Sequence, residues 1–318
     1  MSTIAPQAGQ FKEPPQSSVK PKLFDRMRKA TWQDQRIDWS AYLFLLPFLV
    51  PFFIFVILAI LFGIYVSFTT WGILGTPQWV GLLNYKNAFA NEFVGNAFLN
   101  TLKYGLMIVP GVSILGLIFA VFVNQKWPLY GLSRTVFFAP NVVSSTVIGL
   151  VWVWMLDSQL GIINNYLIKL GIPSVPWLTN VHTSIIGVSI ASIWWDLGFS
   201  FVLYLAALQE IPREVSEAAE VDGASPLQAF WFIKLPLIRS TISMVVTLQL
   251  ISTMRIFSQV YVMTDGGPAN SSQSVIHLIF RQAIQKYQLG YAAALSMLLF
   301  LVILAITLIQ RRFIKETY

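Results

Sequence analysis

Long apolar runs alternate with short polar connections along this chain. After a polar stretch over residues 1–39, six apolar segments each come near or exceed the ~20 residues that a helix needs to cross a bilayer. We place these segments near residues 41–68, 98–123, 134–156, 183–208, 241–263 and 291–310. The pattern predicts an all-α integral membrane protein, with a six-helix transmembrane domain over residues 40–312.

Two parts of the pattern are less regular. The third segment is interrupted by residues that disfavour a continuous apolar helix: Pro140, Asn141, Ser144 and Ser145. Such breaks are tolerated where neighbouring helices cover the freed backbone. The tail, residues 1–39, has the composition of a disordered segment. An alternative for part of the tail is a short helix that lies on the membrane surface, formed around four apolar residues: Leu23, Phe24, Met27 and Trp32.

Composition supports the membrane assignment and excludes several kinds of chemistry. Hydrophobic residues make up 56% of the 318, and charged residues only 11%, against about 25% charged in soluble domains. The absence of cysteine excludes disulfides, thiolate catalysis and Cys-ligated metals. His182 and His277 cannot form a metal site without carboxylates, so we expect no metal site.

The distribution of basic residues predicts the orientation. With the N-terminus inside, the cytoplasmic segments hold fifteen Lys and Arg and the outer segments five, while Arg255 lies inside the membrane. Cytoplasmic loops carry such an excess, so we expect both termini in the cytoplasm. Topology thereby explains the net charge of +7, and we expect no nucleic-acid partner.

Motifs for nucleotide hydrolysis and for metal-dependent catalysis are missing. The sequence has no Gly-x-x-x-x-Gly-Lys phosphate loop, no Gly-Lys pair and no His-Glu-x-x-His. We therefore do not expect an enzyme. Any ATP hydrolysis that this chain depends on must therefore occur on another chain.

A charged stretch, residues 212–236, separates two strongly apolar segments. Pro212 suits the first position of a helix, because its missing N–H would be unpaired there. Glu217 lies near that N-terminus, where the helix dipole favours negative charge. Ala218 and Ala219 are strong helix formers and small enough for close approach by a partner.

The second half of this stretch predicts a turn and a second helix. Gly223 suits the left-handed conformation that ends a helix. Ser225 and Pro226 suit the N-cap and the first position of the next helix. We expect Pro236 to break the chain before the following span.

Three features follow one another here at fixed spacing: Glu217-Ala218-Ala219, then Gly223 after three residues, then Ile233-Lys234-Leu235-Pro236 after nine more. This arrangement resembles the EAA loop of ABC importer permeases. Residues 205–212 resemble the lead-in to that loop in the carbohydrate-uptake branch. Residues 264–268 and 290–296 resemble the first of the two permeases that such importers pair.

The resemblance implies a type I ABC importer permease fold, with a core over residues 97–310, in the bacterial inner membrane. The implied function is translocation of a sugar, oligosaccharide or polyol. The implied partners are a second permease, two ATPase subunits that carry the ATP and Mg, and an extracytoplasmic solute-binding protein. The maltose-type member has extra helices and a large outer domain, so this chain is similar to the compact six-helix form.

The resemblance also assigns contact with the ATPase to the loop over residues 212–236. Glu217 is expected to make the charged contact. The expected coupling residues are Glu217, Ala218, Ala219, Gly223, Leu235 and Pro236.

Asp196 and Arg255 are charges inside predicted spans, which makes them functional candidates. Helical spacing places polar and aromatic residues on one face of each span, a combination that suits a sugar. The candidate solute path is Ser192, Trp195, Asp196, Phe199, Gln249, Ser252, Thr253 and Arg255. The alternatives are an ion pair between Asp196 and Arg255 and ordinary packing of small polar residues. A phosphorylated solute would need more cations than Arg255, which favours a neutral sugar or polyol.

Two other functions remain open from the residues alone. An ion-coupled secondary transporter would use Asp196 and Arg255 as its coupling site. An intramembrane enzyme is disfavoured, because no clear acid–base constellation is visible.

Overall fold

The structure is a computed structural model in which residues 39–72, 75–124 and 130–313 are described. The predictions for the tail fall almost entirely outside these ranges. Within the described residues the chain divides into two units, with the boundary between residues 59 and 60. In the first unit, α2 (Trp39–Phe52) continues into a π-helical turn, η1 (Phe53–Leu58). Its described side chains are almost all exposed, as lipid-facing side chains are.

The second unit is almost entirely helical. Its elements, in chain order, are α3 (Ala59–Ser67), β1 (Thr69–Thr70), β2 (Gln78–Trp79), α4 (Leu83–Ala90), α5 (Glu92–Asn124), α6 (Tyr130–Val142), α7 (Ser145–Met155), α8 (Ile162–Lys169), α9 (Ser184–Gln209), α10 (Arg213–Val221), α11 (Pro226–Ala229), η2 (Phe230–Lys234), α12 (Leu235–Leu237), α13 (Arg239–Met254), α14 (Ser258–Met263), α15 (Val275–Phe280), η3 (Arg281–Gln285) and α16 (Leu289–Phe313). The strands β1 and β2 form an antiparallel pair of two residues each.

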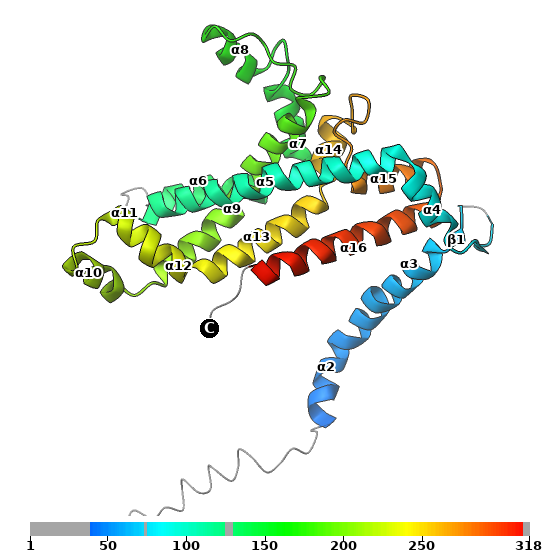
Figure 1. Cartoon of the computed structure of the whole chain (residues 1–318), viewed down its shortest axis with the longest axis horizontal. Helices are drawn as coiled ribbons and strands as arrows, with labels where there is room; N and C mark the ends of the chain where they lie inside the picture. Colours follow the sequence, from blue (N-terminus) through cyan, green and yellow to red (C-terminus); the bar gives the residue numbers. More distant parts are fainter. Residues whose placement is uncertain (1–38, 73–74, 125–129, 314–318) are drawn as a thin grey trace, which may run out of the picture. The chain divides into compact units, whose positions relative to one another are not determined.

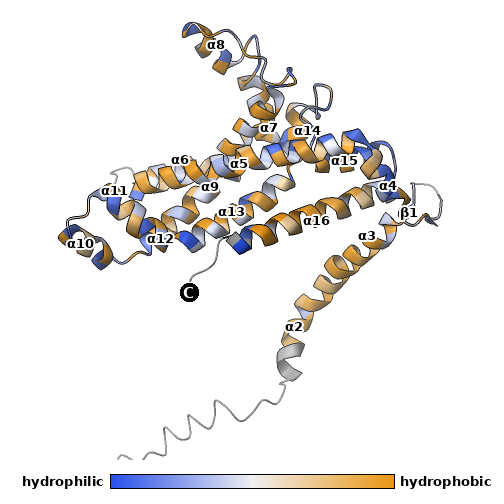
Figure 2. Ribbon diagram, in the orientation of Figure 1, coloured by the Kyte–Doolittle hydropathy of each residue, from blue (hydrophilic) through white to orange (hydrophobic). Residues whose placement is uncertain are grey.

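Four long helices lie side by side in this unit: α9 packs along α5, α13 packs on α5, and α16 packs on α13 (Figure 1). Small residues allow the close approach, as is usual between membrane helices. A Cβ at Gly116 of α5 would lie 3.1 Å from the Cβ of Ser200 on α9. Hydrophobic residues run along α16, and its C-terminal end is hydrophilic (Figure 2).

The membrane-spanning pattern is confirmed in outline. Four helices in the described part of the chain are long and apolar enough to cross a membrane: Leu43–Ser67, Glu92–Asn124, Ser184–Gln209 and Leu289–Gln310. They agree with the predicted first, second, fourth and sixth segments. Six spans result if each of two bent helix pairs counts as one.

The third predicted segment is broken where its sequence is irregular. The axes of α6 and α7 differ by 99° across a break at Val143 and Ser144. A side chain of α9 covers the freed backbone, because the Trp195 indole N–H donates to the carbonyl oxygen of Val143 at 3.0 Å. Asn141 donates in return to the carbonyl oxygen of Trp195 at 3.4 Å. The expected compensation by a neighbouring helix is therefore present.

The fifth predicted segment, 241–263, is wrong in its outer third. Helix α13 ends at Met254, and Arg255 is its C-cap with φ −105° and ψ 18°. The chain then runs through Ile256 and Phe257 before α14 begins. Apolar composition continues across this point, so length and hydropathy alone do not reveal the break. Arg255 thus stands at a helix end, and not in the middle of a span.

Candidate functional site

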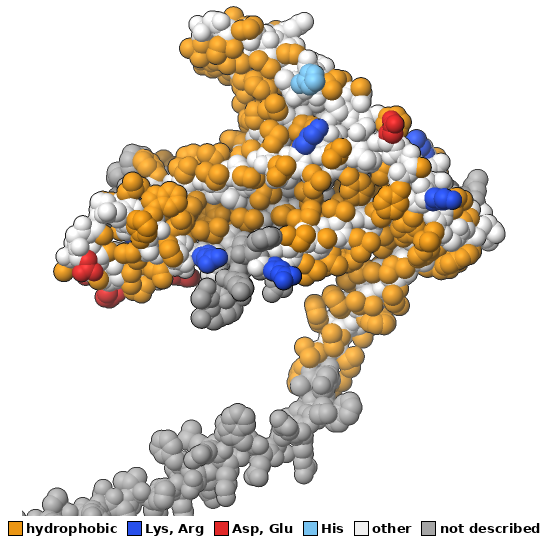
Figure 3. All heavy atoms as spheres, viewed as in Figure 1, with side chains coloured by type: hydrophobic (Ala, Val, Ile, Leu, Met, Phe, Trp, Pro, Cys, Tyr) orange, Lys and Arg blue, Asp and Glu red, His pale blue; other side chains and the backbone are white. Residues whose placement is uncertain are grey.

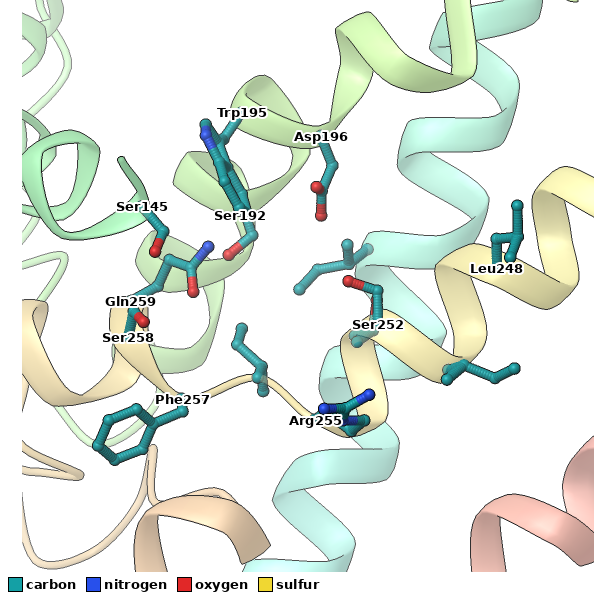
Figure 4. A pocket seen from close by; sticks show the side chains of 14 residues that line it. Ser145, Ser192, Trp195, Asp196, Leu248, Ser252, Arg255, Phe257, Ser258 and Gln259 are labelled. Carbon is teal, nitrogen blue, oxygen red and sulfur yellow. The ribbon is translucent and has the colours of Figure 1, made fainter. Parts of the chain in front are cut away.

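A cavity of about 400 Å³ lies between α9, α13 and the start of α14. Six of the eight residues predicted for the solute path line it (Figure 4): Ser192, Trp195, Asp196, Ser252, Thr253 and Arg255. We call this space the central cavity. Its size falls in the range of small-molecule sites, about 300–1,000 Å³.

The other two predicted residues lie elsewhere. The side chain of Phe199 is 37% exposed and does not line the central cavity. Gln249 is buried, and its Nε2 donates to Oγ of Ser200 at 3.1 Å. Ser200 lies one helical turn beyond Asp196, so this contact joins α13 to α9 beside the cavity. The structure gives Gln249 a packing role at this position.

The break after α13 adds polar groups that sequence reasoning missed. Ser258 and Gln259, at the start of α14, line the central cavity, and Ser145 lines it from the first turn of α7. Phe257 adds an aromatic ring. The available signal was a set of polar residues interspersed with apolar ones in this segment: Ser252, Thr253, Arg255, Ser258 and Gln259.

Asp196 and Arg255 both face the central cavity, with Ser252 labelled between them (Figure 4). Within the described residues no ion pair joins them, so the interpretation of an ion pair tying the fourth and fifth helices together is wrong. The Asp196 carboxylate has no hydrogen-bond partner in that part of the protein either. Charges inside a membrane protein are costly unless water or polar groups solvate them. The cavity is therefore suited to water or to a hydroxyl-rich solute.

Trp195 is fixed in place by the α6–α7 break. Its indole N–H is occupied by the carbonyl oxygen of Val143. The ring therefore reaches the central cavity mainly as an apolar surface, which can stack on the C–H face of a sugar. Ser192 donates its hydroxyl to the carbonyl oxygen of Val188 at 2.8 Å, so its oxygen remains able to accept.

The charged stretch over residues 212–236 folds as two helices around a glycine, as predicted. Helix α10 is followed by Gly223 with φ +79°, a conformation that favours glycine. Ser225 and Gln228 then form a capping box at α11. The Ser225 backbone N–H donates to Oε1 of Gln228 at 2.8 Å, and the Gln228 N–H donates to Oγ of Ser225 at 3.4 Å.

The end of this stretch differs from expectation. Pro236 lies inside α12, and the helix runs on to Leu237. The break falls at Ile238, where the axis turns by 67° into α13. A π-helical turn, η2, precedes the proline. The expectation that Pro236 itself breaks the chain is therefore wrong by two residues.

The predicted coupling residues differ in what they expose. Glu217 and Ala218 are exposed, whereas Ala219 is 4% exposed and its carbonyl oxygen accepts from the Ala224 N–H at 2.9 Å. Acidic side chains gather at the α10 end of the protein (Figure 3). Large apolar side chains are also exposed on this loop, and sequence reasoning did not single them out: Val221, Leu227, Trp231 and Phe232. Exposed apolar surfaces of this kind mark sites of interaction with a protein or with the membrane.

No group of three or more His, Asp or Glu side chains among the described residues is arranged to hold a metal ion. His277 contacts one carboxylate, that of Asp265, through Nε2 at 3.0 Å. The structure of these residues therefore offers no candidate metal centre.

Residues 111–317 match the family model described as the inner membrane component of binding-protein-dependent transport systems. The chain belongs to this family. It is 33% identical to a probable ABC transporter permease of Pyrococcus horikoshii, over 84% of this chain and 92% of that protein. It is 29% identical to the arabinooligosaccharides transport system permease of Bacillus subtilis, over 89% and 91%.

A solved structure shares the fold. The chain resembles a subunit of a bacterial alginate ABC transporter in complex with an alginate pentasaccharide-bound periplasmic protein. The TM-score is 0.77 and the identity 25%, over 90% of this chain and 99% of that one. The predicted ABC permease fold and the multi-pass location in the inner membrane are thus confirmed. Because the chain belongs to this family, the alternative hypothesis of an ion-coupled secondary transporter is rejected.

Proposed function

We propose that this permease imports a carbohydrate through the central cavity, as one of two permease chains in an ATP-driven importer. The observation that carries the proposal is the cavity wall, in which the Asp196 carboxylate lies beside the Trp195 ring and has no partner among the residues that the structure describes. A relative named for arabinooligosaccharides and a structural neighbour that handles alginate support the carbohydrate class.

The wall residues divide into two kinds of contact. Asp196, Ser252 and Gln259 take the hydroxyls of the solute, because each offers an acceptor in a wall with few competing partners. Trp195 and Phe257 contact the apolar C–H faces. Of the described residues in the wall, Arg255 is the one Lys or Arg. One cation suits a neutral sugar or polyol better than a phosphorylated solute, which would require more cationic contacts.

The coupling stretch, residues 212–236, engages an ATPase subunit in this proposal. Glu217 makes the charged contact, and exposed Ala218 allows close packing. Gly223 makes the turn, while Leu235 and Pro236 belong to the second arm. Ala219 is buried, so in this proposal it packs beneath the contact surface and does not touch the ATPase itself. Exposed Trp231 and Phe232 supply the apolar part of the contact.

The remaining parts of the importer are separate chains. Two ATPase subunits carry the ATP and Mg, a second permease completes the path, and an extracytoplasmic solute-binding protein delivers the solute. Dimerisation of the ATPases moves the coupling stretches and switches the permeases between inward and outward openings.

Gentle detergent purification from native membranes, followed by mass spectrometry, tests the assembly. We expect recovery of an ATPase and a second permease. The complex is then placed in proteoliposomes with its binding protein and offered maltotriose, arabinotriose, trigalacturonate and glycerol 3-phosphate. ATP-dependent uptake of a sugar supports the proposal. Uptake of glycerol 3-phosphate alone, or recovery of this chain by itself under conditions that preserve related complexes, would refute it.

A further inference from the structure

A second polar cavity, of about 490 Å³, lies where the residues after β1, the helix α4 and the turn between η3 and α16 meet. It shares no lining residue with the central cavity. Its walls come from residues 70–72, 83–91 and 282–291, which the distribution of basic residues assigns to the outer side and the outer end of the last span. We call it the outer cavity.

The frame of the outer cavity is cross-linked by hydrogen bonds. Asn84 donates through Nδ2 to the carbonyl oxygens of Ser67 at 2.9 Å and Thr69 at 2.8 Å. The Gly290 N–H donates to the carbonyl oxygen of Trp71 at 3.4 Å. A Cβ at Gly290 would collide with the carbonyl oxygen of Thr69, so the two segments meet backbone to backbone. The cavity is therefore preformed.

The walls combine amides with aromatic rings. Four amide side chains line the space beyond the structural Asn84: Asn87, Asn91, Gln282 and Gln288. The side-chain amides of Asn87 and Gln282 make no hydrogen bond within the described residues. Each amide can donate and accept at once, which matches adjacent hydroxyls of a sugar ring.

Three rings complete the wall: Trp71, Tyr287 and Tyr291. The Tyr291 hydroxyl is buried, and within the described residues it has no partner that meets the usual criteria for a hydrogen bond. Its polar neighbour on the same wall is Asn91. Among the described residues that line the cavity, Lys286 is the charged one, and none is Asp or Glu. The occupant is therefore neutral or anionic, with polar edges and apolar faces.

The backbone at this place departs from regular geometry. Tyr287 has φ +57°, which is uncommon for a residue with a side chain. The π-helical turn η3 precedes it. Both features cost free energy and concentrate at functional sites. Here they place the half-exposed Tyr287 ring at the cavity.

We propose that the outer cavity is a second carbohydrate site, which binds a sugar unit of a neutral or anionic saccharide on the outer face of the permease. It shares the solute class of the proposed function but not its site. A segment of a docking protein is the competing occupant. Protein interfaces are built around buried apolar anchors. This wall instead offers, in a preformed concavity, the amides of Asn87 and Gln282, which are unpaired within the described part of the chain.

Photoaffinity labelling distinguishes the two cavities. The purified full-length permease, with its co-purifying partners in nanodiscs, is irradiated with aryl-diazirine glycosides of maltotriose, arabinotriose and trigalacturonate. We expect label on peptides that contain residues 83–91 or 282–291, displaced by the unmodified trisaccharide. Label confined to peptides of α9 and α13 would overturn the outer site while supporting the central cavity. The absence of label on residues 83–91, on residues 282–291 and on the peptides of α9 and α13 would overturn it as well.

Two variants make the assignment specific. Asn87→Leu removes an exposed amide from the wall, and Asn96→Leu is the matched control, because Asn96 is exposed but does not line the cavity. Tyr287→Gly removes the ring while suiting the positive φ. Label on residues 83–91 and 282–291 should fall about five- to tenfold in Asn87→Leu and Tyr287→Gly, and stay unchanged in Asn96→Leu. Unchanged label together with weaker binding of the solute-binding protein would overturn the carbohydrate site in favour of protein docking.

Discussion

Trp195 of α9 donates its indole N–H to the carbonyl oxygen of Val143, 3.0 Å away, in the break between α6 and α7. One side chain thus satisfies a backbone group freed by the break and presents its ring to the central cavity. The geometry of the proposed solute site depends on this hydrogen bond.

Trp195→Phe separates these two roles, because phenylalanine keeps an aromatic face but has no N–H. We expect thermal stability of the purified complex to fall by about 0.5–1.5 kcal/mol, the usual net value of one hydrogen bond. Uptake should fall as well, since the α6–α7 break is then held less firmly. Trp154→Phe is the control, because Trp154 is 59% exposed and does not line the cavity. Equal uptake in both variants would contradict this role.

Gly198 permits the close approach of α9 to α6. An added Cβ would collide with the carbonyl oxygen of Phe137 and lie 2.8 Å from Cα of Phe138. Backbone atoms cannot yield as a flexible side chain does. We therefore expect Gly198→Ala to reduce the free energy of unfolding by about 1–3 kcal/mol and to lower the unfolding midpoint by several degrees. Gly131→Ala, where nothing lies within 4 Å, should leave the midpoint unchanged or higher, because alanine favours helix. Equal midpoints would contradict the packing argument.

The sequence predicted the spans where apolar length decides them, and the hinge at Gly223, where one residue type suits the backbone. It also placed Ser192, Trp195 and Asp196 on one face, because helical periodicity alone determines that. It did not predict the end of α13 at Met254. Neither glycine nor proline marks that point, so tertiary contacts decide it.

The same limit applies to the two cavities. Phe199 shares a helix face with Asp196, yet it does not line the central cavity, because the position of the neighbouring helices decides which residues do so. The outer cavity is lined by both Asn87 and Gln282, which are far apart in sequence. Periodicity cannot predict that they line one cavity.

Asp196→Ala tests the central cavity as the solute site. The carboxylate has no partner among the described residues, so its removal leaves no buried group unpaired and should not unfold the protein. Loss of hydrogen bonds to a charged group costs about 1.5–3 kcal/mol, which predicts a KM for uptake raised about ten- to hundredfold. Phe199→Leu, outside the cavity, should leave KM unchanged. Equal KM values in Asp196→Ala and the natural protein would mean that Asp196 is dispensable for binding the solute.

Glu217→Lys tests the coupling stretch. Glu217 is exposed on α10, so charge reversal should leave membrane insertion intact while weakening the contact with the ATPase. We expect loss of ATPase from the purified complex and of ATP-driven uptake. Asp222→Lys is the matched control, because it reverses an exposed charge at the C-terminal end of the same helix, where the dipole favours a cation. Normal uptake in Glu217→Lys would exclude the proposed contact.

The contact of buried His277 with exposed Asp265 predicts a pH dependence in the outer loop. Burial lowers the pKa of His277 below its ordinary value, and the nearby charge of Arg281 acts in the same direction, while Asp265, 3.0 Å away, opposes both. The unfolded chain therefore binds this proton more readily than the folded one. The contribution of His277 to stability is complete above pH ~6.5 and is lost as pH falls from there toward the lowered pKa.

We expect the unfolding midpoint of the purified complex to fall between pH 7 and pH 5 more steeply in the natural protein than in His277→Gln. His182→Gln is the control, because His182 is exposed and its replacement should leave the slope unchanged. If the His277→Gln slope equals that of the natural protein, other groups carry the acid sensitivity. A steeper slope in His277→Gln would mean that the folded state favours the charged imidazole, because the contact with Asp265 then outweighs burial.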